Sequence, residues 1–321
     1  MSTAKILIIG ANGQLGTELA AALAQRHGAH RIITSDISPI GQHAHIRHEI
    51  LDVTDANQLS DLVGKHGITQ IYHLAATLSA VGEKAPARAW QLNMGGLLNV
   101  LEIAVLHGLD KVFWPSSIAA FGPTTPSDAT PQHTVMEPTT VYGISKLAGE
   151  GWCRWYFENK GVDVRSLRYP GLISYKTPPG GGTTDYAVEI FHSALRHETY
   201  SCFLAPDEAL PMMYMPDAVR ATLELMDAPR ERISEHGSYN LAGISFTPEH
   251  IAAEIRKHYP DFKIAYAPDF RQEIAQGWPS SIDDSLARSD WNWRPAFDLS
   301  TMTRDMLTNL AQRMGHLAQA A

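Results

Sequence analysis

Short β-branched runs alternate with longer helical patterns through the first half of the chain. Strands that are each followed by a helix favour a parallel sheet with helices on both faces. Because such crossovers are right-handed, a doubly wound α/β sheet is the simplest topology. The predicted strands are residues 5–9, 31–36, 46–52, 70–74, 111–115 and 163–169, and the predicted helices between them are 14–26, 55–63, 87–106 and 141–157.

The pattern changes after residue 169. The segment from Thr177 to Gly182 reads Thr-Pro-Pro-Gly-Gly-Gly, which has too many breakers for regular structure. We therefore predict a nucleotide-binding domain at 1–170 and a smaller, mainly helical substrate-binding region at 171–321, parts of which can cross back. The region's predicted helices lie near 184–196, 216–227, 247–258 and 299–314, and its short strands near 213–215, 238–241 and 263–267.

Composition excludes several classes of protein. The chain has 321 residues, with 26 Lys+Arg against 34 Asp+Glu, so its net charge of −8 argues against non-specific nucleic-acid binding. No apolar run approaches the roughly 20 residues of a membrane span, and the first nine residues are too short for a signal peptide. The two cysteines, Cys153 and Cys202, lack a paired spacing, which suits a reducing cytoplasm rather than a disulfide framework.

A metal site is also not expected. Of His43, His45 and His48, the first two are spaced to share one face of a strand, but no cysteine or acidic partner accompanies them in a ligand pattern. We interpret them as a surface strand. Met212, Met213, Tyr214 and Met215 are likewise interpreted as packing beneath the smaller region.

A glycine-rich segment, Gly10–Gly16, follows the first predicted strand and opens the first predicted helix. Its pattern is G-x-x-G-x-x-G rather than the stricter G-x-G-x-x-G, and an Asn-Gly turn without a ligand would use the same residues. Its position favours a phosphate site, because the helix start offers N–H groups and partial positive charge. The candidate residues are Gly10, Asn12, Gly13, Gln14, Leu15 and Gly16.

Three other strand ends point to the same edge of the sheet. Asp36 ends the second strand, 20 residues after Gly16, where a carboxylate binds ribose hydroxyls and repels a 2′-phosphate. NAD is therefore predicted over NADP, although an ordinary strand-end aspartate would look the same. Asp52 and Val53 could contact adenine, and the small residues Leu74, Ala75 and Ala76 would let backbone approach a ribose or phosphate.

A tyrosine and a lysine are spaced to share one helix face. Lys146 lies four positions after Tyr142, which is about one helical turn. A free phenol has a pKa near 10 and is a poor base, but a neighbouring ammonium and an oxidised nicotinamide ring both stabilise the phenolate. Tyr142 could then accept a hydroxyl proton while hydride leaves the same carbon. Ser117 follows the fifth strand and could donate to the reacting oxygen. The same sequence would also arise if Tyr142 only packed in the core, Lys146 only faced solvent and Ser117 only formed a turn.

Together these residues resemble the extended branch of the short-chain dehydrogenase/reductases, the NAD-dependent epimerase/dehydratase family. The resemblance implies a catalytic group of Ser117, Tyr142 and Lys146, a Rossmann-type NAD domain and an isologous homodimer. It adds Asn93, Tyr169 and Pro170 to the cofactor residues. Two departures matter. Phe121 stands where many members have tyrosine, and Ile118-Ala119 replaces the acidic pair of the sugar dehydratases.

Within this family, several segments are similar to the short-chain-type L-threonine 3-dehydrogenases. They are residues 78–80, 114–118, 168–175, 179–187 and 278–284. The similarity implies NAD-dependent oxidation of the threonine β-hydroxyl to 2-amino-3-oxobutyrate. A nucleotide-sugar epimerase with the same three residues is the alternative, and a regulator that binds NAD without turnover is a third.

A threonine substrate would need partners for three polar groups. Thr183 and Thr184 start a predicted helix after three glycines, which suits a carboxylate, and Asp185 or Ser79 could accept from the ammonium. Trp278 could wall the pocket against the methyl group. A capped helix and a core tryptophan are the alternative interpretations.

Overall fold

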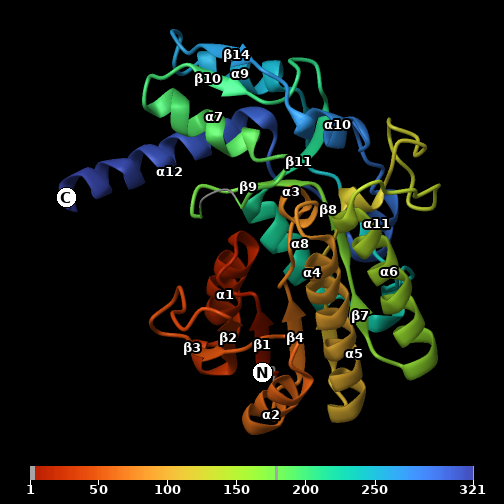
Figure 1. Cartoon of the computed structure of the whole chain (residues 1–321). Helices are drawn as coiled ribbons and strands as arrows, with labels where there is room; N and C mark the ends of the chain where they lie inside the picture. Colours follow the sequence, from red (N-terminus) through yellow and green to blue (C-terminus); the bar gives the residue numbers. More distant parts are fainter. Residues whose placement is uncertain (1–3, 178–179, 321) are drawn as a thin grey trace.

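The computed structural model describes residues 4–177 and 180–320, and a parallel six-stranded sheet forms its centre (Figure 1). The strand order is β3-β2-β1-β4-β5-β7, with β1 in the middle and every pairing parallel. The doubly wound fold predicted from the sequence is thus confirmed. The strands are β1 (Ile6–Ile9), β2 (Ile32–Asp36), β3 (Arg47–Ile50), β4 (Gln70–His73), β5 (Lys111–Phe113) and β7 (Val164–Arg165).

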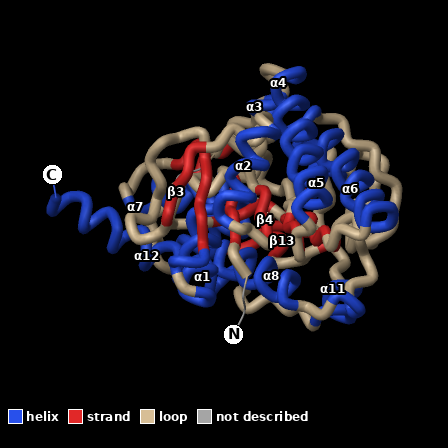
Figure 2. The backbone as a smooth tube through the Cα atoms, turned by 90° about the horizontal axis from the view of Figure 1, so that it is seen from below, coloured by secondary structure: helices blue, strands red, loops and turns tan. Residues whose placement is uncertain are grey.

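Both faces of the inner strands β2, β1, β4 and β5 are buried because their successive side chains enter different cores, whereas the edge strand β3 is exposed or half-buried. In β1, Ile6 and Ile8 pack with α1 and α8, whereas Leu7 and Ile9 pack with α2 and α5. The covering helices therefore form two outer layers (Figures 1 and 2). They are α1 (Gln14–His27) and α8 (Met215–Asp227) on one face, and α2 (Ala56–His66), α5 (Gly96–His107) and α6 (Val141–Lys160) on the other.

A second group of elements carries its own apolar core above the carboxyl edge of the sheet (Figure 1). Strand β11 joins the two cores. Its Met212 and Tyr214 enter the upper core, while Met213 and the following Met215 pack in the sheet core, so only half of these four residues pack as predicted. The elements of this group are β9 (Gly171–Ile173), α7 (Tyr186–Leu195), β10 (Tyr200–Cys202), β11 (Leu210–Tyr214), β13 (Ile244–Phe246), α9 (Pro248–Arg256), β14 (Ile264–Tyr266), α10 (Phe270–Gln276) and α12 (Leu299–Ala320).

The chain crosses between the two groups several times. After β11 it returns through α8 to the sheet core, and β12 (Tyr239–Asn240) then pairs with β8 (Leu167–Tyr169). Strand β8 also pairs with β6 (Ser116–Ser117), which makes a small sheet beside the large one. Helix α11 (Ser285–Trp291) packs against β12. The smaller region is therefore not one continuous stretch of chain.

Several sequence predictions differ from the structure in detail. The single strand predicted at 163–169 is two strands in different sheets, β7 and β8. The helix predicted at 87–106 is divided into α4 (Pro86–Trp90), a π-helical turn (Gln91–Gly95) and α5. The π-helical turn carries Asn93, which is held by side-chain hydrogen bonds described below. Other elements absent from the prediction are β6, β9, β10, β13, α3 (Ser79–Gly82), α10 and α11.

Of the three histidines interpreted as a surface strand, only His48 lies in a strand. His43 and His45 precede β3 in a loop, where the His43 ring bonds the Thr17 carbonyl. His48 is in β3 and bonds Thr34 and the Ser38 carbonyl. Within the described residues, no three His, Cys, Asp or Glu side chains are arranged to hold a metal ion, and both cysteines are buried free thiols.

One prediction about apolar length was wrong. The continuous helical stretch Pro86–His107 is long and apolar enough, by length and composition alone, to cross a membrane. Half of its most apolar window is buried inside this structure, because α5 packs between the sheet and its neighbouring helices. Residues 1–3, part of the N-terminal segment examined for a signal peptide, and Pro178 and Pro179 of the breaker-rich segment lie outside the described residues.

Candidate active site

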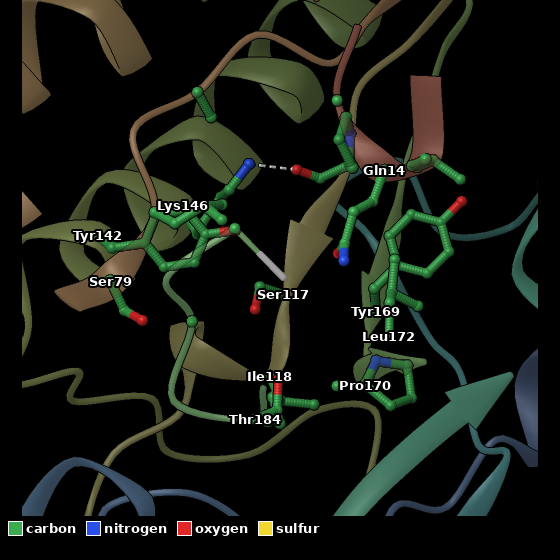
Figure 3. A pocket seen from close by; sticks show the side chains of 18 of the residues that line it. Gln14, Ser79, Ser117, Ile118, Tyr142, Lys146, Tyr169, Pro170, Leu172 and Thr184 are labelled. Carbon is green, nitrogen blue, oxygen red and sulfur yellow. Dashed lines mark hydrogen bonds between the residues drawn. The ribbon is translucent and has the colours of Figure 1, made fainter. Parts of the chain in front are cut away.

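A cavity of about 300 Å³ opens at the carboxyl edge of the sheet, under the second group of elements (Figure 3). The ends of several strands and the start of α6 surround it, as expected for a doubly wound sheet. Its lining includes most of the predicted site residues: Gly10, Gly13, Gln14, Leu15, Gly16, Leu74, Ala76, Ser79, Ser117, Tyr142, Lys146, Tyr169, Pro170, Thr183, Thr184, Asp185 and Trp278.

Two glycines of the Gly10–Gly16 segment are required by backbone packing. Gly10 has a φ of +75°, and a Cβ there would lie 2.6 Å from the Ala75 nitrogen. A Cβ on Gly16 would lie 2.6 Å from the Gly10 carbonyl oxygen. Gly13 is different, because a Cβ there meets only an ordinary contact inside the chain. Its missing side chain instead leaves the start of α1 open to the cavity, which fits a pyrophosphate.

Asp36 lies at the end of β2 beside this turn. Its carboxylate accepts hydrogen bonds from the Asn12 nitrogen at 3.3 Å and the Ser38 nitrogen at 3.2 Å. These bonds fix the carboxylate next to the glycine turn while leaving it half-buried. The arrangement fits a dinucleotide whose ribose would lie over the end of β2.

Other predicted cofactor residues do not line the cavity. Asp52 accepts from Thr54, and Val53 is buried in the core of the α2 and α5 layer. Ala75 packs against Gly10. The Asn93 side chain donates to the Thr77 carbonyl at 3.2 Å and accepts from its nitrogen at 2.8 Å, which holds the loop after β4.

The start of α6 places the tyrosine and lysine. Thr140 caps the helix by accepting from the Gly143 nitrogen at 3.0 Å, and a Glu83 oxygen accepts from the Val141 nitrogen at 2.7 Å. Lys146 donates to the Pro115 carbonyl, the bond drawn as a dashed line in Figure 3. Tyr142 and Ser117 both point into the cavity from different elements (Figure 3).

Burial dominates the electrostatics of this pair. It raises the pKa of Tyr142 to about 12, with the neighbouring Ser117 hydroxyl acting in the opposite direction. It lowers the pKa of Lys146 to about 7, opposed by Cys153 and Glu150. The expectation that Lys146 lowers the pKa of Tyr142 is therefore not met by these residues alone. The Lys146 ammonium is directed at the Pro115 carbonyl, so a phenolate here needs an additional positive charge in the cavity.

The predicted substrate residues line the cavity from the start of α3 and from the segment that leads into α7. Asp185 is buried, which raises the pKa of its carboxyl, and it accepts from the Gly181 and Gly182 nitrogens at 2.8 and 2.7 Å. The carboxylate thus also holds the glycine loop itself. The Ser79 hydroxyl lies 3.5 Å from the Thr183 hydroxyl, so the two face one another across the cavity wall.

Sequence reasoning missed several wall residues. Leu78, Pro115, Ile118 and Leu172 give the cavity an apolar side. Their types are those of any buried strand or loop, so the sequence carries no signal that separates them from core residues. The contact of Glu83 with the start of α6 was also missed. It could be predicted only by knowing that the turn after α3 lies beside α6.

The match to the NAD-dependent epimerase/dehydratase family covers residues 6–242. The chain belongs to this family. The predicted family and its NAD cofactor are thereby confirmed, and the six-stranded doubly wound sheet agrees with them. An uncharacterized epimerase/dehydratase of Staphylococcus saprophyticus is 47% identical over 307 residues, which are 94% of this chain and 96% of the relative.

Solved structures give a finer comparison. The holo form of a GalE-like L-threonine dehydrogenase from Cupriavidus necator is 68% identical, with a TM-score of 0.95 over 95% of this chain and 99% of that one. A monomeric L-threonine 3-dehydrogenase from a metagenome database, in its apo form, is 48% identical. Its TM-score is 0.93, over 96% of this chain and 99% of that chain.

Proposed function

We propose that this family member is an NAD-dependent L-threonine 3-dehydrogenase, which oxidises the threonine β-hydroxyl to give 2-amino-3-oxobutyrate. The observation that carries the proposal is the likeness to the Cupriavidus necator dehydrogenase at 68% identity along nearly the whole chain. The cavity supports it independently. Lys146 is the one cation among its described lining residues, which suits a small amino alcohol better than a second diphosphate.

NAD, when bound, would accept the hydride through its nicotinamide ring. The residues that would hold it surround the glycine turn and the neighbouring strand ends. Gly13 leaves room for the phosphates, Asp36 would bind the ribose, and Asn93 holds the loop that carries the next contacts. The full proposed set is Gly10, Asn12, Gly13, Gln14, Leu15, Gly16, Asp36, Asp52, Val53, Leu74, Ala75, Ala76, Asn93, Tyr142, Lys146, Tyr169 and Pro170.

Tyr142 is the proposed general base. Its phenolate form would take the β-hydroxyl proton, and Ser117 would donate to the same oxygen and orient it. Lys146 would stabilise the phenolate and bind the cofactor ribose. Hydride transfer needs the β-carbon of threonine near the cofactor ring. The walls of the cavity would hold the substrate in that position.

Substrate recognition is assigned to the start of α3, the segment that leads into α7, and Trp278. Thr183 and Thr184 would bind the carboxylate, and Ser79 or Asp185 would accept from the ammonium. Trp278 and the aliphatic lining would contact the methyl group.

A coupled set of assays tests the proposed function. NADH absorbance is followed with NAD and separate samples of L-threonine, L-allo-threonine, L-serine and UDP-sugars. We expect NADH formation with L-threonine as the preferred substrate. Inversion of a UDP-sugar without NADH release would instead favour an epimerase, and tight NAD binding without any turnover would favour a regulator.

Replacing Asp36 with serine is expected to relax the preference for NAD. The carboxylate repels a 2′-phosphate, and serine removes the charge while keeping a hydrogen-bonding group. The ratio of kcat/KM for NAD to that for NADP should therefore fall by about tenfold or more, which corresponds to about 1.4 kcal/mol or more. Asp61→Ser, at an exposed position of α2 outside the proposed cofactor set, is the control. An unchanged ratio in Asp36→Ser would remove this role.

We also propose a homodimer in the cytoplasm. Helices α5 and α6 lie side by side (Figures 1 and 2) and expose apolar residues, among them Trp152, Trp155 and Leu106 at 38, 42 and 72% of their surface. Because exposed apolar patches mark interfaces, Trp152→Glu with Trp155→Glu should convert a dimer to a monomer. Light scattering after gel filtration measures this. A monomeric wild-type chain, as in the metagenome relative, would contradict the proposal.

A further inference from the structure

A buried acid lies two helical turns after Tyr142 on the catalytic helix. Tyr142, Lys146 and Glu150 follow one another at four-residue intervals on α6, which places them on one face. Glu150 is 4% exposed and does not line the cavity, so the mechanism proposed above gives it no part. A carboxylate is rarely buried unless every oxygen has a partner.

The partners of Glu150 come from the two strands that carry site residues. One carboxylate oxygen accepts from the Ser116 hydroxyl at 2.6 Å and from Arg168 Nε at 2.9 Å. The other accepts from Arg168 Nη2 at 2.7 Å. In the register of β6 and β8, Ser116 pairs with Arg168, and the next pair is Ser117 with Tyr169. Glu150 therefore ties down the residues that immediately precede two residues of the cavity wall.

Arg168 extends this frame. Its other nitrogen donates to the Gln132 carbonyl and the Asn240 side chain, both at 2.9 Å. The guanidinium is 4% exposed in its side chain and thus fully engaged between α6, β8 and β12. Such a charge-assisted fork fixes direction as well as distance.

Glu150 also supplies charge to Lys146. The titratable groups that act on Lys146 are Tyr142, Glu150 and Cys153 on α6, and His73 on β4. Burial lowers the pKa of His73 to about 3, so the ring is neutral, and it raises the pKas of the Cys153 thiol and the Tyr142 phenol. Of these groups, Glu150 is the one that carries an opposite charge in the cofactor-free protein. Arg168 offsets part of that charge but lies beyond Glu150, on β8.

We infer that Glu150 is a positioning residue for the reaction, which aligns Ser117 through Ser116 and keeps the buried Lys146 cationic. This inference rests on the proposed function for its kinetic consequence. Its electrostatic part concerns residues of this chain alone. A carboxylate that only stabilised the fold would affect neither the titration of Lys146 nor the pH profile.

The test compares Glu150→Gln with Asp163→Asn. Asp163 pairs with the fully buried Arg165 at 2.8 Å, so it is a matched buried acid. It precedes β7 and therefore lies at the amino edge of the sheet, whereas the cavity lies at the carboxyl edge. The titration of Lys146 is followed without cofactor by the ε-¹³C signal of labelled lysine, assigned with Lys146→Arg. The pH profile of kcat and kcat/KM is measured on the same samples.

In Glu150→Gln we expect the Lys146 midpoint to fall by about one pH unit, equivalent to a tenfold change in its protonation equilibrium. The alkaline limb of kcat should move the same way, kcat should fall more than KM changes, and Glu150→Asp should restore most of both. Asp163→Asn should lower Tm without moving either curve. If Glu150→Gln does not fold, the paired Glu150→Gln with Arg168→Gln removes both buried charges. The Lys146 midpoint should then still fall, but by less than in Glu150→Gln alone, because loss of the Arg168 charge acts in the opposite direction; an unchanged or raised midpoint would overturn the inference.

An unchanged Lys146 midpoint in folded Glu150→Gln would overturn the inference, as would equal shifts in Asp163→Asn. Absence of threonine turnover in the wild-type protein would instead overturn the proposed function. In that case the lysine titration still decides whether Glu150 holds the charge of Lys146.

Discussion

Tyr142→Phe is expected to reduce kcat for threonine oxidation by about 10³-fold or more, because it removes the proposed general base and the reacting oxygen's partner. The ring stays in place, since phenylalanine keeps the shape of the buried side chain. NADH binding, measured by fluorescence titration, should therefore remain within about threefold of wild type, a difference below about 1 kcal/mol.

The control for this variant is Tyr156→Phe. Tyr156 lies on the same helix and bonds Glu102 rather than facing the cavity, so its loss should leave kcat nearly unchanged. Wild-type turnover by Tyr142→Phe would remove Tyr142 from the mechanism. Equal losses in both variants would point to damage of α6 instead.

Gly16→Val is expected to lower both stability and cofactor binding. Even the first carbon of the new side chain would lie 2.6 Å from the Gly10 carbonyl oxygen and 2.8 Å from the Ala11 backbone. These are backbone atoms of the turn, so relief requires the turn to move away from the start of α1. Overpacking of this kind costs about 1–3 kcal/mol, and the displaced N–H groups would no longer converge on a phosphate.

Thermal unfolding and NADH titration measure the two effects in Gly16→Val. The matched control is Gly64→Ala in α2, where a Cβ would make only an ordinary contact at 3.5 Å. It should keep wild-type affinity and gain a little helix stability. A Gly16→Val protein with wild-type affinity for NADH would show that the turn is not the pyrophosphate site.

The order of elements was predictable because its signals are local. The run at 5–9 is rich in isoleucine and the run at 70–74 carries Ile71, Tyr72 and Leu74, and the structure has β1 and β4 there. The segment at 163–169 was harder, since Arg165 and Arg168 within it serve different partners. Arg165 caps the end of α8 and pairs with Asp163, whereas Arg168 turns to α6. No local sequence pattern indicates which of the two arginines contacts α8 and which contacts α6.

The candidate site was likewise predictable only in part from the sequence. Tyr142, Lys146 and Ser117 were proposed as a group because their spacing, their positions and the family resemblance agree, and the structure places all three around one cavity. The pKa values of Tyr142 and Lys146 were not, because they depend on how deeply α6 is buried and on the direction of the Lys146 ammonium. Asp185 was expected to face substrate, and its second task of holding Gly181 and Gly182 emerged only from loop geometry.

The sequence by itself determined the alternation of strands and helices, the glycines that a tight turn demands and the residue types capable of proton transfer. Periodicity and backbone sterics act over a few residues, so they can be read without knowing the fold. Only the tertiary structure decided that Glu150 meets Ser116 and Arg168, and that Thr183, Thr184 and Asp185 line the same cavity as Tyr142. Burial and long-range charge depend on packing between segments that are far apart along the chain, which no short pattern records.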